Sequence, residues 1–216
     1  MTEFYGLPFY TVPEVLIPRP ETEELVQWII QENKLARPTI LDIGTGTGCI
    51  PISLRKNIAD SIVLACDISP VCAETARRNA ELNNCEISVF EYDILTQTPE
   101  VNFPEMDILV SNPPYIRESE KHQMEKNVLD FEPGLALFVP DSDPLLFYKS
   151  IAEFARTRLK DGGKLYFEIN EAFGKECSEM LQQKGFSGVT VKKDIHGKDR
   201  FMAAVLLKSG SNFCTQ

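Results

Sequence analysis

Thr39-Ile40-Leu41-Asp42-Ile43-Gly44-Thr45-Gly46-Thr47-Gly48 is the stretch that decides the fold of this chain. Its first half is a short apolar run, which predicts a buried strand. Glycine then stands at every second position. Residues 49–57 follow as a predicted helix, whose Pro51 lies in the first turn, where proline is tolerated. The stretch therefore predicts a strand, a tight glycine turn and a helix.

The same alternation continues along the chain. Further strands are predicted at residues 62–66, 87–90, 106–110, 164–169, 189–191 and 201–207, and further helices at residues 21–29, 71–82, 145–159 and 173–184. Alternating strands and helices are typical of an α/β fold, a doubly wound and mostly parallel sheet with helices on both faces. The last two strands have no helix between them, so we expect them to pair as a hairpin and the last strand to be antiparallel.

Composition limits the class of protein. The chain has 216 residues, 43% of them hydrophobic, and a formal net charge of -10 without a basic stripe, which argues against direct nucleic-acid binding. None of its 6 cysteines forms a C-x-x-C pair, so we expect no metal and no redox dithiol. There is no apolar run of membrane-spanning length. We expect a cytoplasmic protein with reduced thiols.

The chain divides into three parts by composition. Residues 1–37 are rich in aromatic residues and proline before a helix, and we expect an arm or hairpin and a helix packed on the main domain. Residues 38–208 form that domain, and residues 209–216 a flexible tail. Within the domain, residues 116–144 show little regular period, and such long loops are usually functional.

A nucleoside site is predicted at one rim of the sheet. Ligands of open α/β sheets bind at the carboxyl ends of the strands, where the glycine turn, Asp67 and Asp93 fall. The G-x-G-x-G pattern is neither the G-x-G-x-x-G of dinucleotide enzymes nor a P-loop. Asp67 stands about 20 residues further on, which suits a ribose hydroxyl pair. The alternatives are a helix-capping aspartate and a plain strand-to-helix turn.

A nucleoside bound without a pyrophosphate cradle indicates S-adenosylmethionine. Asp42 and Asp93 suit this cofactor, because a sulfonium cation with an ammonium group favours an acidic pocket. Asp42 has an equally good alternative role, which is to order the glycine turn.

Ser111-Asn112-Pro113-Pro114-Tyr115 forms a rigid corner after the strand at residues 106–110. The two prolines fix their own φ and extend the residue before each of them, and they have no N–H to donate. The corner therefore presents oxygen acceptors beside an aromatic face, an arrangement that suits a planar –NH2 group. The alternative is an ordinary Pro-Pro loop.

With these motifs, the chain resembles the class I S-adenosylmethionine-dependent methyltransferases and, among them, the release-factor glutamine methyltransferases (the PrmC/HemK family). The resemblance covers nearly the whole chain. Its segments are residues 16–23 (Leu-Ile-Pro-Arg-Pro-Glu-Thr-Glu), 42–48, 111–116, 131–133 (Phe-Glu-Pro) and 197–200 (Gly-Lys-Asp-Arg). It implies a seven-stranded sheet and methyl transfer to the side-chain nitrogen of the glutamine in the Gly-Gly-Gln motif of peptide chain release factors.

The resemblance also assigns residues. The cofactor contacts it implies are Gly44, Thr45, Gly46, Thr47, Gly48, Asp67, Asp93, Ile94 and Asn112, beside Asp42; the substrate contacts are Phe9, Arg19, Asn112, Pro113, Pro114 and Tyr115. Catalysis is expected from Asn112 and Pro113, whose oxygens accept the two N–H bonds of the glutamine amide, and from Tyr115, which packs on it. For Phe9, filling the core is an equal alternative.

Two rival functions remain open on the sequence. An adenine or cytosine amino-methyltransferase shares the Asn-Pro-Pro-Tyr motif, and a binding module could keep the fold without catalysis. Relatives carry an N-terminal helical domain, so we expect this chain to be a fragment or a shortened member. We expect a monomer whose partners are release factors, with no membrane contact.

Overall fold

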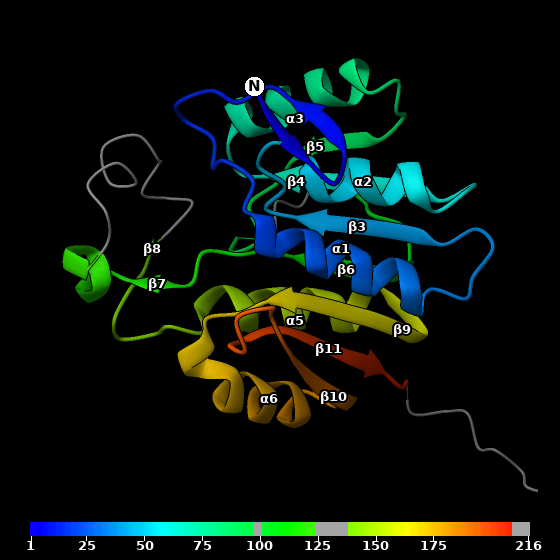
Figure 1. Cartoon of the computed structure of the whole chain (residues 1–216). Helices are drawn as coiled ribbons and strands as arrows, with labels where there is room; N and C mark the ends of the chain where they lie inside the picture. The colour runs from blue at the N-terminus through cyan, green and yellow to red at the C-terminus, as the bar shows by residue number, and fades with distance from the viewer. Residues whose placement is uncertain (97–100, 124–137, 209–216) are drawn as a thin grey trace, which may run out of the picture.

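A seven-stranded sheet runs through the centre of the molecule in the computed structural model, which describes residues 1–96, 101–123 and 138–208 (Figure 1). Side by side, its strands are β10 (Phe186–Lys193), β11 (Asp199–Leu206), β9 (Leu159–Glu168), β6 (Met106–Ser111), β3 (Thr39–Ile43), β4 (Ile62–Asp67) and β5 (Ser88–Glu91). Strand β11 is antiparallel to both neighbours, and the other neighbouring pairs are parallel. The predicted seven-stranded, doubly wound sheet with an antiparallel last strand is confirmed.

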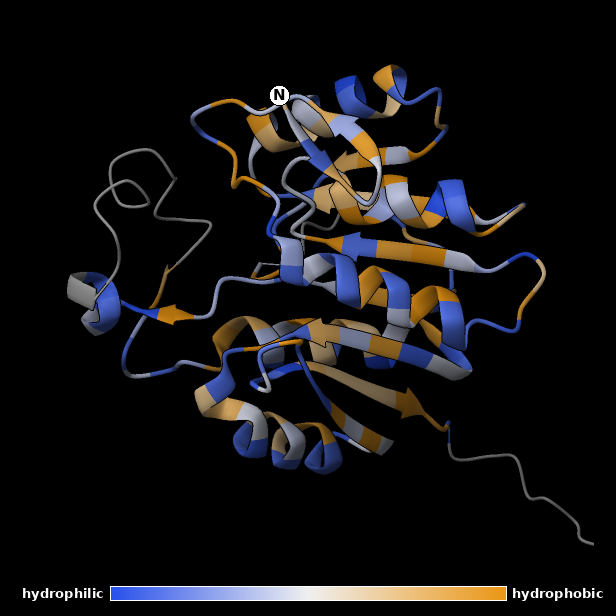
Figure 2. Cartoon of the chain, viewed as in Figure 1, coloured by the Kyte–Doolittle hydropathy of each residue, from blue (hydrophilic) through white to orange (hydrophobic). Residues whose placement is uncertain are grey.

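Helices cover both faces of the sheet, and each face has its own hydrophobic core. The helices are α1 (Pro20–Glu32), α2 (Cys49–Asn57), α3 (Pro70–Leu82), α5 (Leu146–Arg158) and α6 (Gly174–Gln183). Residues of α5 and α6 pack in one core, and residues of α1 and α2 pack in the other. In β3, Leu41 belongs to the first core and Ile40 to the second, which explains why a central parallel strand carries apolar residues on both of its faces. Figure 2 shows hydrophobic residues concentrated along the central strands.

An N-terminal hairpin lies against the second core. Strands β1 (Thr2–Phe4) and β2 (Leu7–Phe9) pair antiparallel, and the two residues between them both have positive φ, as the tight turns that join hairpin strands require. Phe4 and Phe9 are buried edge to face with 6.1 Å between ring centroids. The Asn79 side chain on α3 bonds both the N–H (2.6 Å) and the carbonyl (3.1 Å) of Tyr10. The arm is therefore tied to the domain.

Two segments differ from the sequence-based prediction. The sequence predicts a helix over residues 145–159 and a strand from residue 164, but α5 ends at Arg158 and β9 already begins at Leu159. Gly162 has φ +75° and sits at a register irregularity, so the glycines bend a strand rather than stop a helix. Strand β10 is also longer than predicted, because its pairing with β11 continues on both sides of a bulge near Gly188.

The described parts of the segment at residues 116–144 contain more regular structure than the sequence indicated. Strand β7 (Ile116–Arg117) pairs in parallel with β8 (Phe138–Val139), and a 3-10 helix, η1 (Glu118–Gln123), follows β7. The Phe131-Glu132-Pro133 motif and the tail at residues 209–216 lie outside the described residues. Across the described ranges, no helix is both long and apolar enough to cross a membrane.

We predict that Gly48→Ala destabilises the fold by about 2–4 kcal/mol, because a left-handed residue and a crowded Cβ act together. Gly48 has φ +79°, and a Cβ there would lie 3.1 Å from the Cβ of Ala76 and 3.2 Å from its Cα. The matched control is Gly162→Ala, at φ +75° with nothing within 4 Å of the added Cβ, which should cost about 1–2 kcal/mol. Urea unfolding measures both, and equal losses would contradict the crowding argument.

Candidate active site

The carboxyl ends of β3, β4, β6 and β9 meet at one rim of the sheet. Strand order reverses between β3 and β6, since β4 and β5 lie on one side and β9 on the other. Ile43 pairs with Ser111 and with Cys66, and Ser111 pairs in turn with Phe167. The next residue along each of these strands, Gly44 after β3, Asn112 after β6 and Glu168 at the end of β9, therefore lies at the topological switch point, where ligands of such sheets bind.

The glycine turn is hydrogen-bonded to the end of β4. The N–H groups of Gly44 and Thr45 donate to the Cys66 carbonyl at 2.8 and 3.0 Å, and the Gly46 N–H donates to Asp67 Oδ2 at 2.9 Å. Gly44, Gly46 and Gly48 all have positive φ, which only glycine adopts readily. The loop is thus a preformed backbone surface open to close approach by a ligand.

Asp67 orders this turn. Its second oxygen, Oδ1, accepts the Ser69 N–H at 2.9 Å, so the carboxylate links the glycine turn to the start of α3. Burial raises the pKa of Asp67, and these backbone hydrogen bonds oppose the rise. The loop-ordering role that the sequence offered to Asp42 is therefore performed by Asp67.

Asp42 lies fully buried in β3, and among the described residues neither of its carboxylate oxygens has a hydrogen-bond partner. The buried hydroxyls of Thr45 and Thr47 likewise have none in that part of the chain. Burial raises the pKa of Asp42 to about 7, with the nearby Thr45 hydroxyl opposing the rise and the charge of Asp67 adding to it. Buried polar atoms are normally paired. This group of three suits a polar or cationic ligand at the glycine turn.

The pair Asp93-Ile94 follows β5. The oxygens of Asp93 accept the Leu95 N–H at 2.9 Å and the Thr96 hydroxyl at 3.0 Å, so this aspartate shapes its own turn. The Ile94 side chain is buried in the core under α5 and α6. The structure thus gives both residues a packing or turn role, and their cofactor contacts stay a prediction.

The strand end before the Asn-Pro-Pro-Tyr corner is hydrogen-bonded to the strand end before the glycine turn. The buried Ser111 hydroxyl donates to the Ile43 carbonyl at 2.7 Å, which joins the ends of β6 and β3. Pro113 is buried, and the Asn112 side chain is only half-buried. The Asn170 side chain donates to the Tyr115 carbonyl at 3.1 Å and holds the far end of the corner.

A carboxylate that the sequence did not single out lies under the corner. Glu168 ends β9 and is buried; its Oε2 accepts the Thr22 hydroxyl at 2.7 Å, and its Oε1 accepts the Tyr115 hydroxyl at 3.2 Å. The Thr22 hydroxyl in turn accepts the Asn112 amide Nδ2 at 3.4 Å. Burial raises the pKa of Glu168, opposed by the Thr22 hydrogen bond and the charge of Arg200. The signal in the sequence was a charged residue at the end of an apolar strand.

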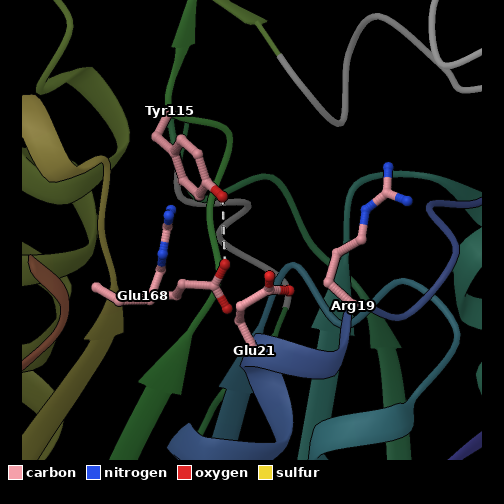
Figure 3. A pocket seen from close by; sticks show the side chains of 5 residues that line it. Arg19, Glu21, Tyr115 and Glu168 are labelled. Atoms are coloured by element: carbon pink, nitrogen blue, oxygen red, sulfur yellow. Dashed lines mark hydrogen bonds between the residues drawn. The ribbon is translucent and has the colours of Figure 1, made fainter. Parts of the chain in front are cut away.

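A cavity of about 250 Å³ opens beside these groups, lined by Arg19, Glu21, Tyr115, Glu168 and Arg200. Figure 3 shows Tyr115 and Glu168 pointing toward each other, with the Glu21 carboxylate close to Glu168 and Arg19 directed away from the pair. The structure therefore brings Arg19 and Tyr115 to the same cavity. Phe9 does not line it, because this side chain is packed in the core against Phe4, as the alternative for Phe9 proposed.

The sheet order, the glycine turn after β3 and the corner after β6 together define a methyltransferase with the class I fold. A solved structure of a methyltransferase from Pyrococcus furiosus is similar to this chain with a TM-score of 0.68, over 94% of this chain and 91% of that one. At 19% identity, this likeness concerns the fold. The family model described as methyltransferase small domain matches residues 21–131.

Curated relatives define the family more narrowly. The release factor glutamine methyltransferase of Flavobacterium psychrophilum is 54% identical over 205 residues, which are 93% of this chain and 71% of that protein. Its counterpart from Bacteroides thetaiotaomicron is 52% identical over 202 residues, which are 94% of this chain and 72% of that protein. The chain belongs to the release factor glutamine methyltransferase family, and the predicted family is confirmed.

We predict that Asp42→Asn becomes more stable relative to the wild type as pH rises. The folded wild type holds the Asp42 proton up to about pH 7, while the unfolded chain releases it near the ordinary value of 3.8. Wild-type stability therefore falls across that interval, by up to about 4 kcal/mol from this group, and the asparagine removes the fall. Urea unfolding of both proteins at about pH 5 and about pH 8 measures the change. A difference between them that does not vary with pH would contradict a buried, unpaired Asp42.

Proposed function

We propose that this chain transfers a methyl group from S-adenosylmethionine to the side-chain amide nitrogen of the glutamine in the Gly-Gly-Gln motif of peptide chain release factors. The observation that carries the proposal is the corner beside the glycine turn. Register places Asn112 next to Gly44, and Asn112 is half-buried rather than packed in a core. Its side chain contacts Thr22, which is bonded to Glu168 in the lining of the cavity. Membership of the release factor glutamine methyltransferase family supports the same substrate.

The residues at the rim fit S-adenosylmethionine. Asp42, Thr45 and Thr47 have buried polar atoms without hydrogen-bond partners among the described residues, and these atoms suit a polar, cationic ligand. We propose that Gly44–Gly48 lie against the bound nucleoside, that Asp67 accepts a ribose hydroxyl while it holds the Gly46 N–H, and that Asp93 and Ile94 border the adenine. When bound, this cofactor supplies an activated methyl on a sulfonium, so the enzyme needs in-line approach more than an acid or a base.

The corner then orients the acceptor of the methyl group. An amide nitrogen is a poor nucleophile because its lone pair is delocalised. The Asn112 Oδ1 and Pro113 carbonyl oxygens would accept the two N–H bonds of the glutamine, which fixes the amide plane and aims the nitrogen. Such positioning supplies up to about 7–11 kcal/mol in ideal cases. These acceptors also stabilise positive charge that develops on the nitrogen. Pro114 keeps the corner rigid, Tyr115 covers the amide, and Arg19 shapes the cavity.

We assign the methyl transfer to residues 38–208, with residues 1–37 as a cover that carries Arg19 and Thr22 to the site. We propose a monomer acting in the cytoplasm, where release factors function in translation. The rival substrate is an exocyclic amino group of DNA or RNA. The net charge of -10 disfavours it, since nucleic-acid binding depends on basic side chains.

Tritiated methyl transfer tests the substrate. We expect label on a purified release factor and none on the same factor with the Gly-Gly-Gln glutamine changed to alanine. Label on DNA or RNA instead, or label that survives the glutamine change, would falsify the proposed reaction.

We predict that Asn112→Ala lowers turnover by about 10²–10³, comparable with the loss of one preorganised hydrogen-bonding group in other enzymes. Cofactor affinity, measured by calorimetry, should change much less. The matched control is Asn102→Ala, an exposed asparagine before β6 at the opposite end of that strand. Full turnover in Asn112→Ala would show that the corner does not position the substrate.

A further inference from the structure

Asn112 poses a problem of orientation for the reaction. Its side chain has an acceptor end and a donor end of nearly the same shape, and the proposed chemistry needs the acceptor to face the substrate. A rotation by half a turn would put an NH2 group against the NH2 group of the substrate, and the two would repel. The proline corner fixes the backbone but does not choose between the two ends of this amide.

We propose that Thr22 and Glu168 are positioning residues, which form a hydrogen-bond relay that turns the Oδ1 atom of Asn112 toward the carboxamide substrate. The inference rests on the proposed function and deepens it, because it says what sets the active orientation of the catalytic amide.

The direction of the relay follows from the chemistry of its members. A glutamate carboxylate only accepts hydrogen bonds, so the Thr22 hydroxyl, 2.7 Å from Oε2, must donate its proton to Glu168. The Thr22 oxygen can then only accept. It therefore selects the NH2 end of Asn112, which lies 3.4 Å away, and Oδ1 is left for the substrate. A protonated Glu168 could donate instead and would reverse this order.

Burial raises the pKa of Glu168, but three of its neighbours stabilise the carboxylate form that the relay needs. The charge of Arg200 favours the carboxylate, as do the hydrogen bonds from Thr22 and Tyr115, while burial and the charge of Glu21 oppose it. Tyr115 donates to Oε1, so one carboxylate anchors the corner at both Asn112 and Tyr115. Thr22 lies in the first turn of α1, Glu168 at the end of β9 and Asn112 in the loop after β6, so tertiary packing alone assembles the relay.

Thr22→Val and Thr22→Ser separate a relay from simple packing. Valine keeps the shape of threonine and removes the hydroxyl, whereas serine keeps the hydroxyl. We expect Thr22→Val to lower kcat by about 10–100-fold, the range found for hydrogen-bonding partners that orient metal ligands in enzymes. Thr22→Ser should stay within about threefold of the wild type, and the affinity for S-adenosylmethionine should change little in both.

A double-mutant cycle and an amide spectrum complete the test. In the Asn112→Ala background, Thr22→Val should have no further effect on kcat, because the relay acts only through the Asn112 amide. The side-chain amide NMR signals lost in Asn112→Ala should shift in Thr22→Val relative to the wild type. A glutamine at position 168 can donate as well as accept, so Glu168→Gln should lower kcat as Thr22→Val does. Glu168→Gln also replaces Thr22→Val in the test if Thr22→Val fails to fold.

The outcomes distinguish the two proposals. An active wild type and an impaired Asn112→Ala, together with normal kcat in Thr22→Val and Glu168→Gln, would overturn the relay and leave the proposed function standing. The relay would also fall if Thr22→Ser were as impaired as Thr22→Val, or if the effects of Thr22→Val and Asn112→Ala on kcat multiplied. A wild type that transfers no methyl group to release factors would overturn both.

Discussion

The parallel pairing of β3 with β6 is the constraint on which the site depends. The register sets Ile43 opposite Ser111, and the buried Ser111 hydroxyl locks the two strand ends together at 2.7 Å. The glycine turn and the Asn-Pro-Pro-Tyr corner therefore begin side by side, directly after these paired residues. A shift by one residue would turn the side chains of β6 to the other face and separate the two motifs. The methyl donor and its acceptor can meet only because this register is kept.

Around that pairing, the fold buries three carboxyl groups at one rim, and each has a different set of neighbours. Asp67 is satisfied by two backbone amides, and Glu168 by two hydroxyls. Asp42 has no hydrogen-bond partner in the described structure, and burial raises the pKa of all three. A buried acid without a partner destabilises a fold. Its place beside the glycine turn is consistent with a role in binding a cationic ligand.

The sequence alone was enough to locate the parts of the site that depend on glycine and proline. The glycines after β3 and the prolines after β6 have backbone properties that no other residues share, so their positions could be interpreted without coordinates. The roles of the aspartates were harder to assign, because Asp42 and Asp67 both fit either ligand binding or loop ordering. Only the 2.9 Å contact from the Gly46 N–H showed that Asp67 orders the loop. Phe9 was ambiguous for the same reason, since an aromatic residue suits a core as well as a site.

By itself, the sequence determined the alternation of strands and helices, the seven-stranded sheet expected from its family, and the presence of a proline corner close to a glycine turn. These depend on periodicity and on glycine and proline, which act over a few residues. The tertiary structure decided which distant side chains share the site. Thr22 and Glu168 are separated by 146 positions, and no local pattern links a threonine in the first turn of a helix to a glutamate at the end of a strand. Their contact exists because α1 packs over β9, and such packing is a property of the whole fold.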